Sequence, residues 1–371
     1  MITIGYVISQ LENSGPVNIL YGIIKNLDKK IFKSYIITLS EEKVNSRKKE
    51  FENLGIEVVL HKVNNFSLLL KEDKKFKEIL INKNIDILHS HCFRSAILTS
   101  KINILKISTL HLDFQTDFRY KYGMLKGKIF EKIYLSALKK MDLNISCGEG
   151  VANLIFAHNK LVTKVVQNGI DREKININNV RESKEELRKK LRLKENEKYF
   201  ISVGSLDERK NVLWLSKNFI NSKIKNLNLI LVGEGNKKEE IENLKNENII
   251  LTGKCSLLEV QEYLKASDYY VATSKSEGLP NSVLEALEFE LPVLLSDIEP
   301  HKEILENYDC GKIFKLDDKE NFKEQLKNIL KMGKDEKEFK KIKLFIDAKR
   351  MSKNYEEIYK KIKEKNGCKY L

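Results

Sequence analysis

Short apolar runs alternate with helical stretches along the whole chain. A first series of runs lies at residues 2–8, 34–39, 56–60, 85–89, 106–110 and 143–147. A second series lies at residues 199–203, 228–232, 248–252, 269–273 and 292–296. Strands that alternate with helices predict a parallel sheet covered by helices on both faces, which is the doubly wound α/β fold.

The charged stretch at residues 172–190 separates the two series. A chain of 371 residues is long enough for two domains that each bury a core of their own. We therefore predict two Rossmann-like domains, residues 1–170 and 171–344, followed by a lysine-rich helix at about 345–371. Open sheets bind ligands beyond the carboxyl ends of their strands, so we expect the reaction in a cleft between facing domains.

Glycine and proline lie beside the carboxylates Glu277 and Glu285, eight positions apart, in SEGLPNSVLEALEFELPVLLSD, residues 276–297. Gly278 allows close approach of a ligand, and Pro280 directly precedes a predicted helix. The unpaired N–H groups and the dipole at a helix start favour phosphate, so Glu277 and Glu285 could hold the hydroxyls of a nucleotide sugar there. Two simpler interpretations stay open: Ser282 and Glu285 fit a capping box, and a loop glutamate such as Glu277 is usually solvated.

Arg209 and Lys210 follow the apolar strand YFISVG by a short loop. No D-x-D motif offers a metal site for a departing diphosphate, so a leaving group of this kind would need cations from the protein. Arg209 can grip a phosphate with two N–H groups, and Lys210 can supply a point charge. A surface turn at Glu208, Arg209 and Lys210 is the alternative.

The net charge is +14, and most of it falls in the first half of the chain. Residues 1–175 hold 28 Lys and Arg against 18 Asp and Glu. The segment 118–142 holds seven basic residues and only Glu131 before Asp142, interleaved with apolar residues. Such a segment is typical of a solvated lysine-rich surface, but it can also lie on an anionic membrane.

The five cysteines, Cys92, Cys147, Cys255, Cys310 and Cys368, form no C-x-x-C pair, which argues against disulfides and structural zinc. No apolar run reaches the roughly 18 residues that cross a bilayer, and no basic leader precedes the first strand. We expect a cytoplasmic protein, with the inner face of the membrane as a candidate surface. His89 and His91 lack a third ligand at metal-binding spacing, so we expect cleft or core histidines.

The block from Glu277 to Glu285 resembles the E-x(7)-E region of the retaining glycosyltransferases of family 4, which have the GT-B fold. The resemblance extends to VGSLDERKN at residues 203–211, to LILVGEG at 229–235 and to the segment 251–274. It also includes VVQNGID at 165–171, which is similar to an interdomain turn, and DILHSH and STLHLD in the first half. The resemblance covers nearly the whole chain and is most specific in the second half.

The resemblance implies a GT-B enzyme that transfers a hexose-type sugar from a nucleoside-diphosphate sugar to an acceptor hydroxyl with retention of configuration. It implies catalytic roles for His111, Glu277, Arg209 and Lys210. The implied donor-binding residues are Gly15, Gly204, Arg209, Lys210, Gly233, Lys254, Glu277, Gly278, Leu279, Pro280, Asn281, Ser282 and Glu285. It further implies that the C-terminal helix packs back on the first domain, and that neither a metal nor a cofactor beyond the sugar donor takes part.

The acceptor expected from the basic first half is a saccharide or lipid-linked saccharide of surface polysaccharide synthesis. Three departures from the family pattern bear on the donor site. The first loop reads Asn13-Ser14-Gly15-Pro16 where relatives carry a glycine pair, Ser205 stands in place of an arginine, and Glu290 replaces a glycine. We take the change at Glu290 as a surface adjustment, although it could reshape the turn.

Other reactions on the same fold stay open at this stage, namely a sugar-nucleotide epimerase and a phosphorylase. A phosphorylase would use a disaccharide and inorganic phosphate, and an epimerase would need no acceptor. The basic charge alone also admits a nucleic-acid-binding protein. We expect no nucleic-acid partner, because the sequence has no zinc finger, helix-turn-helix or aromatic-rich basic strand.

Overall fold

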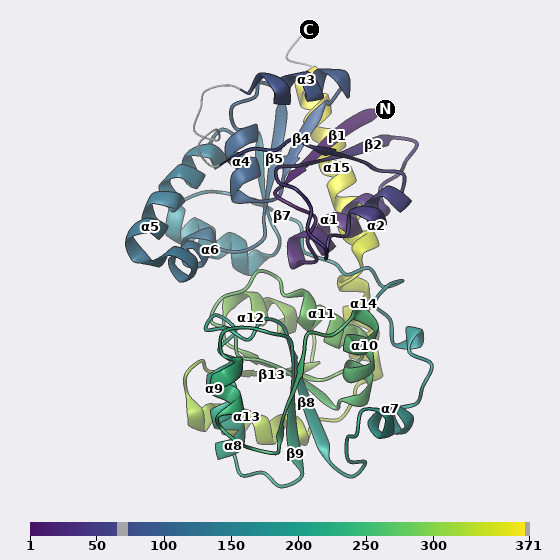
Figure 1. The fold of residues 1–371 in the computed structure, drawn as a ribbon, viewed down its shortest axis with the longest axis vertical. Coiled ribbons are helices and arrows are strands. Elements are labelled where there is room, and N and C mark those ends of the chain that lie inside the picture. The colour runs from purple at the N-terminus through teal and green to yellow at the C-terminus, as the bar shows by residue number, and fades with distance from the viewer. Residues whose placement is uncertain (65–72, 368–371) are drawn as a thin grey trace. The chain divides into compact units, whose positions relative to one another are not determined.

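The computed structural model describes residues 1–64 and 73–367, without the side chains of 366 and 367. The chain forms two compact units (Figure 1), unit 1 from Met1–Gly169 and Ala348–Leu371, and unit 2 from Ile170–Asp347. Cys368 and the last residues of the predicted C-terminal helix lie outside the described residues. No helix within the described residues is both long enough and apolar enough to cross a membrane.

Unit 1 is built on a seven-stranded parallel sheet with strand order β3-β2-β1-β4-β5-β6-β7. Its strands are β1 (Ile2–Ile8), β2 (Phe32–Thr38), β3 (Glu57–Leu60), β4 (Ile87–Ser90), β5 (Leu105–Leu110), β6 (Leu143–Ser146) and β7 (Lys164–Val165). Its helices are α1 (Gly15–Lys25), α2 (Lys48–Asn53), α3 (Lys74–Asn82), α4 (Phe93–Thr99), α5 (Phe114–Leu138), α6 (Glu149–Asn159) and α15 (Ala348–Gly367).

Helices cover both faces of this sheet because successive side chains of a strand point to opposite faces. In β1, Ile4 and Tyr6 belong to a buried cluster with α1 and α15. Val7 belongs to a second cluster with residues of α3 and α4. The helix α15 packs closely on α1, since a Cβ on Gly22 would lie 3.2 Å from the Cβ of Ala348.

Unit 2 is built on a six-stranded parallel sheet with strand order β10-β9-β8-β11-β12-β13. Its strands are β8 (Lys198–Val203), β9 (Leu227–Val232), β10 (Ile249–Gly253), β11 (Tyr269–Ala272), β12 (Val293–Ser296) and β13 (Gly311–Phe314). Its helices are α7 (Lys184–Lys190), α8 (Val212–Asn221), α9 (Lys238–Glu242), α10 (Leu257–Ala266), α11 (Asn281–Glu288), α12 (Glu299–Leu305), α13 (Lys319–Leu330) and α14 (Glu336–Phe345), with a short 3₁₀ turn at Ile177–Asn179.

Both sheets reverse their strand order at one place. In unit 1 the reversal lies between β1 and β4, and in unit 2 it lies between β8 and β11. The connections on the two sides of such a point leave the sheet in opposite directions, so a crevice forms beyond the carboxyl ends of the two strands. Each unit therefore offers one favoured place for a ligand.

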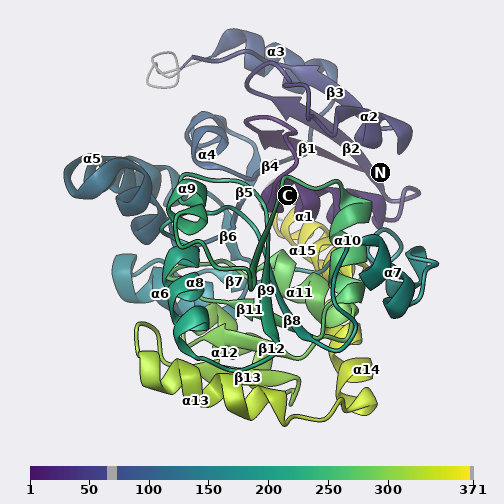
Figure 2. The ribbon, with the colours of Figure 1, turned by 60° about the horizontal axis from the view of Figure 1, so that its bottom comes forward.

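The helix α5 is interrupted at Gly123, whose φ of 75° and ψ of 177° lie outside the helical range. Two helical arms meet there, and α5 extends outward at one side of unit 1 in both views (Figures 1 and 2). A positive φ of this size is accessible to glycine at little cost. The interruption separates a first arm that follows β5 from a second arm that leads to β6.

Candidate active site

The carboxyl ends of β8, β9 and β10 lie side by side on one side of the reversal point of unit 2. Gly204 follows β8, Gly233 follows β9, and Lys254 follows β10. The amide of Gly204 donates to the carbonyl of Val232 at 3.0 Å, and the amide of Gly233 donates to that of Gly253 at 2.9 Å. These bonds continue the sheet by one residue, while the Lys254 side chain is exposed.

Gly233 lies so close to the neighbouring strand end that no side chain fits. A Cβ built on Gly233, whose φ is 140°, would lie 1.9 Å from the carbonyl oxygen of Gly204. A Cβ built on Gly204 would lie 3.2 Å from Cε of Lys210, so this residue leaves room for the lysine stem. The two glycines bring bare backbone to the carboxyl edge of the sheet.

Glu277 lies between the two basic residues that follow β8. Nζ of Lys210 is 2.5 Å from Oε1 of Glu277, and an N–H of Arg209 donates to Oε2 at 3.0 Å. The same Arg209 nitrogen also donates to the carbonyl of Ser276 at 2.8 Å. Glu277 is only 7% exposed, so it is not a solvated loop residue. Because Arg209 and Lys210 both contact its carboxylate, Glu208-Arg209-Lys210 is not merely a surface turn.

The loop from β8 to α8 is held in place by its own hydrogen bonds. The amide of Lys210 donates to Oδ1 of Asp207 at 2.8 Å, and the hydroxyl of Thr273 donates to the carbonyl of Lys210 at 3.0 Å. Asn211 takes a left-handed conformation, with φ of 57°, directly before α8. The loop is thereby tied to the end of β11, which fixes the basic pair beside Glu277.

Two opposing effects act on the carboxyl of Glu277. Burial alone would raise its pKa, but the charges of Lys210 and Arg209 and hydrogen bonds from Lys210 and Ser274 lower the pKa to about 2. The group is therefore a carboxylate at physiological pH. A fixed anion between two fixed cations is an arrangement that can bind hydroxyl and phosphate groups side by side.

The helix α11 begins at Asn281, with Pro280 in the N-cap position and no side-chain cap. Ser282 therefore lies inside the helix, where its Oγ accepts a hydrogen bond from the Tyr270 hydroxyl at 2.9 Å. The capping-box interpretation of Ser282 and Glu285 is wrong, because the serine lies too far into the helix to cap it. Gly278, Leu279 and Pro280 are buried in the loop before the helix.

The Glu285 carboxyl has no hydrogen-bond or ion-pair partner among the residues that the structure describes. It lies one turn into α11 and is partly buried. Burial raises its pKa from an ordinary value of 4.5 to about 7. A carboxyl that lacks partners inside the protein is suited to accept hydrogen bonds from a ligand.

The sequence analysis missed two buried residues, Ser296 at the end of β12 and His301 in α12. His301 is fully buried, and its Nδ1 lies 3.0 Å from Oγ of Ser296. The Ser296 hydroxyl in turn donates to the carbonyl of Ser274 at 2.7 Å, near the start of the loop that carries Glu277. Burial lowers the pKa of His301 to about 4, so the ring is neutral. A lone histidine gives no signal in the sequence, because its contact with Ser296 depends on the turn that joins β12 to α12.

His111 and Gly15 belong to unit 1. The rings of His91 and His111 share a hydrogen bond of 3.1 Å between Nδ1 and Nε2, and burial lowers the pKa of His111 to about 4. His89, by contrast, is a core residue that bonds Tyr359 and Thr109. Gly15 is the first residue of α1.

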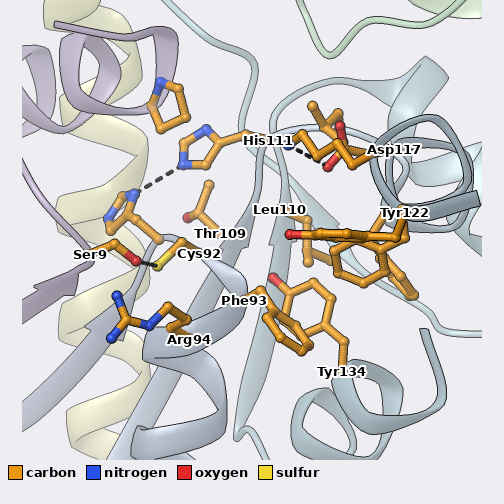
Figure 3. Close-up of a pocket in the computed structure, with 16 residues that line it drawn as sticks. Ser9, Cys92, Phe93, Arg94, Thr109, Leu110, His111, Asp117, Tyr122 and Tyr134 are labelled. Atoms are coloured by element: carbon orange, nitrogen blue, oxygen red, sulfur yellow. Dashed lines mark hydrogen bonds and ion pairs between the residues drawn. The ribbon is translucent and has the colours of Figure 1, made fainter. Parts of the chain in front are cut away.

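A cavity of about 320 Å³ lies at the reversal edge of unit 1, beyond the ends of β1, β4 and β5. Figure 3 shows Ser9, Cys92 and Arg94 on one side and Asp117, Tyr122 and Tyr134 on the other, with His111 above. The cavity is lined by Ser9, Pro16, His91, Cys92, Phe93, Arg94, Thr109, Leu110, His111, Leu112, Phe114, Asp117, Phe118, Lys121, Tyr122 and Tyr134. Aromatic rings with a few polar groups are typical of sites that bind small molecules.

The expected site residues thus divide between the units. His111 and Gly15 lie in unit 1, and the other expected residues lie in unit 2, where Arg209, Lys210 and Glu277 are in contact. Within the described residues no group of three or more His, Cys, Asp and Glu side chains could hold a metal ion. Cys92, Cys147, Cys255 and Cys310 are free thiols.

Glu290 occupies the turn between α11 and β12 with a left-handed φ of 57°. This is the conformation that glycine favours, so the glutamate keeps the turn rather than reshaping it. Its carboxylate lies 3.0 Å from Nζ of Lys334 and 2.8 Å from Nζ of Lys343. The substitution is therefore accommodated by two ion pairs.

Two family models match successive parts of the chain. The model of glycosyltransferase family 4 matches residues 14–174, and that of glycosyl transferases group 1 matches residues 183–343. An uncharacterized glycosyltransferase of Methanocaldococcus jannaschii is 32% identical over 188 residues, which are 48% of this chain and 45% of that protein. The match therefore spans less than half the length of this relative.

Two bacterial relatives match over longer stretches. The capsular polysaccharide biosynthesis glycosyltransferase CapH of Staphylococcus aureus is 24% identical, over 82% of this chain and 84% of that protein. The UDP-Gal:alpha-D-GlcNAc-diphosphoundecaprenol alpha-1,3-galactosyltransferase of Escherichia coli is 26% identical, over 66% of each.

Solved structures share the fold over nearly the whole chain. A glycosyltransferase of Rickettsia africae superposes with a TM-score of 0.75 at 19% identity, covering 97% of this chain and 98% of the other. Anabaena HepE in complex with UDP and glucose superposes with a TM-score of 0.74 at 14% identity, covering 96% and 99%. The α/β fold with two domains is thus the GT-B fold, and the chain belongs to the family 4-like glycosyltransferases.

Proposed function

We propose that this glycosyltransferase binds a nucleoside-diphosphate hexose at the reversal edge of unit 2 and transfers the hexose to an acceptor hydroxyl with retention of configuration. The contact of Glu277 with Arg209 and Lys210 carries the proposal. It joins an anion for sugar hydroxyls to two cations for phosphates, beside the start of α11. The Anabaena relative was solved with UDP and glucose, which supports a donor of this class.

In the proposed complex the diphosphate lies between the basic pair and the first turn of α11. Arg209 and Lys210 would neutralise the charge that develops on the leaving diphosphate, a task for which fixed cations are effective in a water-poor site. Glu277 would accept hydrogen bonds from the hexose, and Glu285 would accept them from the ribose. The positive charge comes from the protein, so we propose transfer without a metal ion.

Retention can arise from a covalent sugar intermediate or from front-face displacement. We favour the front-face path, in which the bond from the acceptor oxygen to the sugar forms on the side from which the diphosphate leaves. The leaving phosphate oxygen takes the acceptor proton, so no enzymic base is needed at that step. His111 would hydrogen-bond the reacting sugar as a neutral imidazole, in keeping with its lowered pKa.

For the acceptor we propose a saccharide, or a saccharide carried on a lipid, in the assembly of a surface polysaccharide. The two bacterial relatives support this class, one by its role in capsule synthesis and one by its diphosphoundecaprenol acceptor. Such an acceptor would place the enzyme in the cytoplasm, at the inner face of the membrane. We propose no nucleic-acid partner.

A thermal-shift panel tests the donor site first. The panel consists of UDP, GDP, ADP and CMP, each alone and with an attached sugar. We expect at least one nucleoside diphosphate to raise the melting temperature, because a ligand that binds only the folded state stabilises it. Lys210→Met should abolish this shift, whereas Lys217→Met, on an exposed face of α8, should keep it. If no nucleotide raises the melting temperature, the proposal fails.

The reaction itself is tested with the nucleotide sugar that binds. Proton NMR of the first product should show the anomeric configuration of the donor. An inverted product would disprove retention. Turnover of the nucleotide sugar to its epimer without an acceptor would indicate an epimerase, and release of sugar phosphate from a disaccharide and phosphate would indicate a phosphorylase.

A further inference from the structure

The two arms of α5 meet in a tight corner. Gly127, in the second arm, lies so close to the first that an added Cβ would be 2.9 Å from the carbonyl oxygen of Phe118. The rings of Tyr122 and Phe130 pack across the corner with centroids 4.7 Å apart. We name residues 119–129 the α5 corner. Its residues 119–126 are all exposed.

The α5 corner gathers apolar side chains that point into solvent. Of the fourteen large apolar residues that are exposed in the described parts of the chain, five lie here. They are Tyr120, Tyr122, Met124, Leu125 and Ile129. Leu125 is 85% exposed and Met124 is 68% exposed. Single exposed apolar residues are ordinary, but a cluster of five in a protruding corner marks an interaction surface.

The charges of the α5 corner have one sign. Arg119, Lys121, Lys126 and Lys128 are exposed, and residues 118–130 contain no Asp or Glu. Lys121 pairs with Asp117 at 2.8 Å. Exposed aromatic and aliphatic side chains among lysines and arginines match the chemistry of a bilayer with anionic headgroups. A protein partner of ordinary composition offers no such field of negative charge.

The same helical turn also forms a wall of the unit 1 cavity. Phe118, Lys121 and Tyr122 line this cavity from the first arm, and Tyr134 lines it from the second. Tyr122 lies both in the cavity wall and in the exposed corner, where it is 47% exposed. The cavity wall thus shares Tyr122 with the α5 corner, and Figure 3 shows this residue at one side of the cavity.

We propose that the α5 corner docks on an anionic phospholipid bilayer, so that the cavity beside it receives the saccharide end of an acceptor whose lipid stays in that bilayer. Met124, Leu125 and Ile129 enter the acyl boundary, while Arg119, Lys126 and Lys128 contact phosphates. The role of the cavity in receiving the acceptor rests on the proposed glycosyltransferase function, whereas docking on the bilayer does not.

Vesicle co-sedimentation tests the docking with the full chain. At low salt the protein should bind vesicles of phosphatidylglycerol and phosphatidylcholine, and should bind pure phosphatidylcholine at least tenfold more weakly. Leu125→Asp should lower the affinity at least tenfold. Leu344→Asp is the matched control, because it puts the same charge in place of a leucine that is 71% exposed in α14, and it should leave binding unchanged.

The charges are tested separately. Lys126→Gln with Lys128→Gln should weaken binding about 25-fold, since each lysine near an anionic surface contributes about fivefold. Lys337→Gln with Lys340→Gln removes two exposed lysines of α14 and should leave binding within about twofold. Equal loss in both pairs would mean that the net charge, and not the α5 corner, drives the attraction, which would overturn the proposal.

Three further results would overturn it. The first is equal sedimentation of the wild type and Leu125→Asp, and the second is a dimer, by sedimentation velocity, that Leu125→Asp dissociates. The third is nucleic-acid binding that the same substitution abolishes while vesicle binding persists. Nucleotide thermal shifts of Leu125→Asp should match those of the wild type, so loss of docking with intact nucleotide shifts separates this inference from the donor proposal.

Hydrogen exchange tests separately whether the cavity receives the saccharide end of the acceptor. Anionic vesicles doped with polyprenyl diphosphate-linked saccharide should protect backbone amides of residues 117–122 from hydrogen exchange beyond the effect of the same anionic vesicles without it. Protection by anionic lipid alone, with no increment from the doped vesicles, would disprove this role of the cavity and leave docking in place.

Discussion

Nζ of Lys210 lies 2.5 Å from Oε1 of Glu277, so the lysine proposed to hold phosphate is engaged by the carboxylate proposed to hold the sugar. Glu277→Gln removes the anion that competes with the diphosphate for the two cations. A nucleoside diphosphate without sugar should therefore bind at least as tightly to this variant by calorimetry. Sugar transfer should fall about 10- to 100-fold, since a hydrogen bond to a charged group contributes about 1.5–3 kcal/mol.

The control for that prediction is Glu208→Gln, which removes an exposed glutamate that pairs with Lys275. It should leave both nucleotide affinity and transfer close to wild type. If Glu277→Gln lost nucleotide binding and transfer together while remaining folded, the proposal that the cations bind the diphosphate and the carboxylate binds the sugar would be wrong.

Glu285 gives stability an unusual pH dependence. Its pKa is raised from 4.5 to about 7, so the folded chain binds this proton more tightly than the unfolded chain. Its contribution to stability is full below about pH 4.5 and is lost as the pH rises to about 7. Glu285→Gln removes this loss, so the stability of the variant relative to wild type should increase by up to about 3 kcal/mol between pH 4.5 and 7.5.

Urea unfolding of the wild type and Glu285→Gln at several pH values measures this difference, and Glu306→Gln serves as an exposed control. A difference that stayed flat with pH would mean that the Glu285 carboxyl titrates as it does in an unfolded chain. The same variant should also lose nucleotide affinity, because an amide is a weaker acceptor for ribose hydroxyls than a carboxylate.

Gly233 should be among the least replaceable residues of unit 2. In Gly233→Ala the new methyl group would lie 1.9 Å from a backbone oxygen, at a φ of 140° that side chains rarely adopt. We expect a loss of about 3 kcal/mol or more in the free energy of unfolding. Gly333→Ala adds the same methyl group in open space and should change stability by less than about 1 kcal/mol. Denaturant unfolding compares the two.

Glu290 carries a conformational cost that can be isolated by two substitutions. Glu290→Gln removes the charge but keeps a side chain at φ of 57°, whereas Glu290→Gly removes both. The glycine variant should therefore be more stable than the glutamine variant by about 1 kcal/mol, the cost of a side chain in this conformation. A glutamine variant of equal or greater stability would show that the turn is unstrained.

The sequence predicted the strands of both sheets well where they are long and apolar. The run at 2–8 is β1, and the run at 199–203 is β8 but for one residue. Two strands were missed, β7 at Lys164–Val165 and β13 at Gly311–Phe314. Both lie at sheet edges, where one side lacks a neighbour and the apolar pattern is correspondingly weak. Their pairing is set by the strand beside them and not by their own composition.

For the candidate site, the sequence predicted residues but not the contacts among them. Arg209 and Lys210 were expected at the phosphates and Glu277 at the sugar, yet their mutual ion pairs depend on how the β8 and β11 loops meet. Ser282 followed by Glu285 has the spacing of a capping box, but the helix starts at Asn281, and Tyr270 bonds the serine. The contact of His91 with His111 depends in the same way on neighbouring strands, which a local pattern does not reveal.

The interruption of α5 at Gly123 lies within the single connection that crosses from β5 to β6. The strands β5 and β6 pair directly in register, so the length and surface of the arms between them do not determine how the sheet is assembled. The 25-residue segment can therefore vary in length and surface while the strand order of the sheet stays the same.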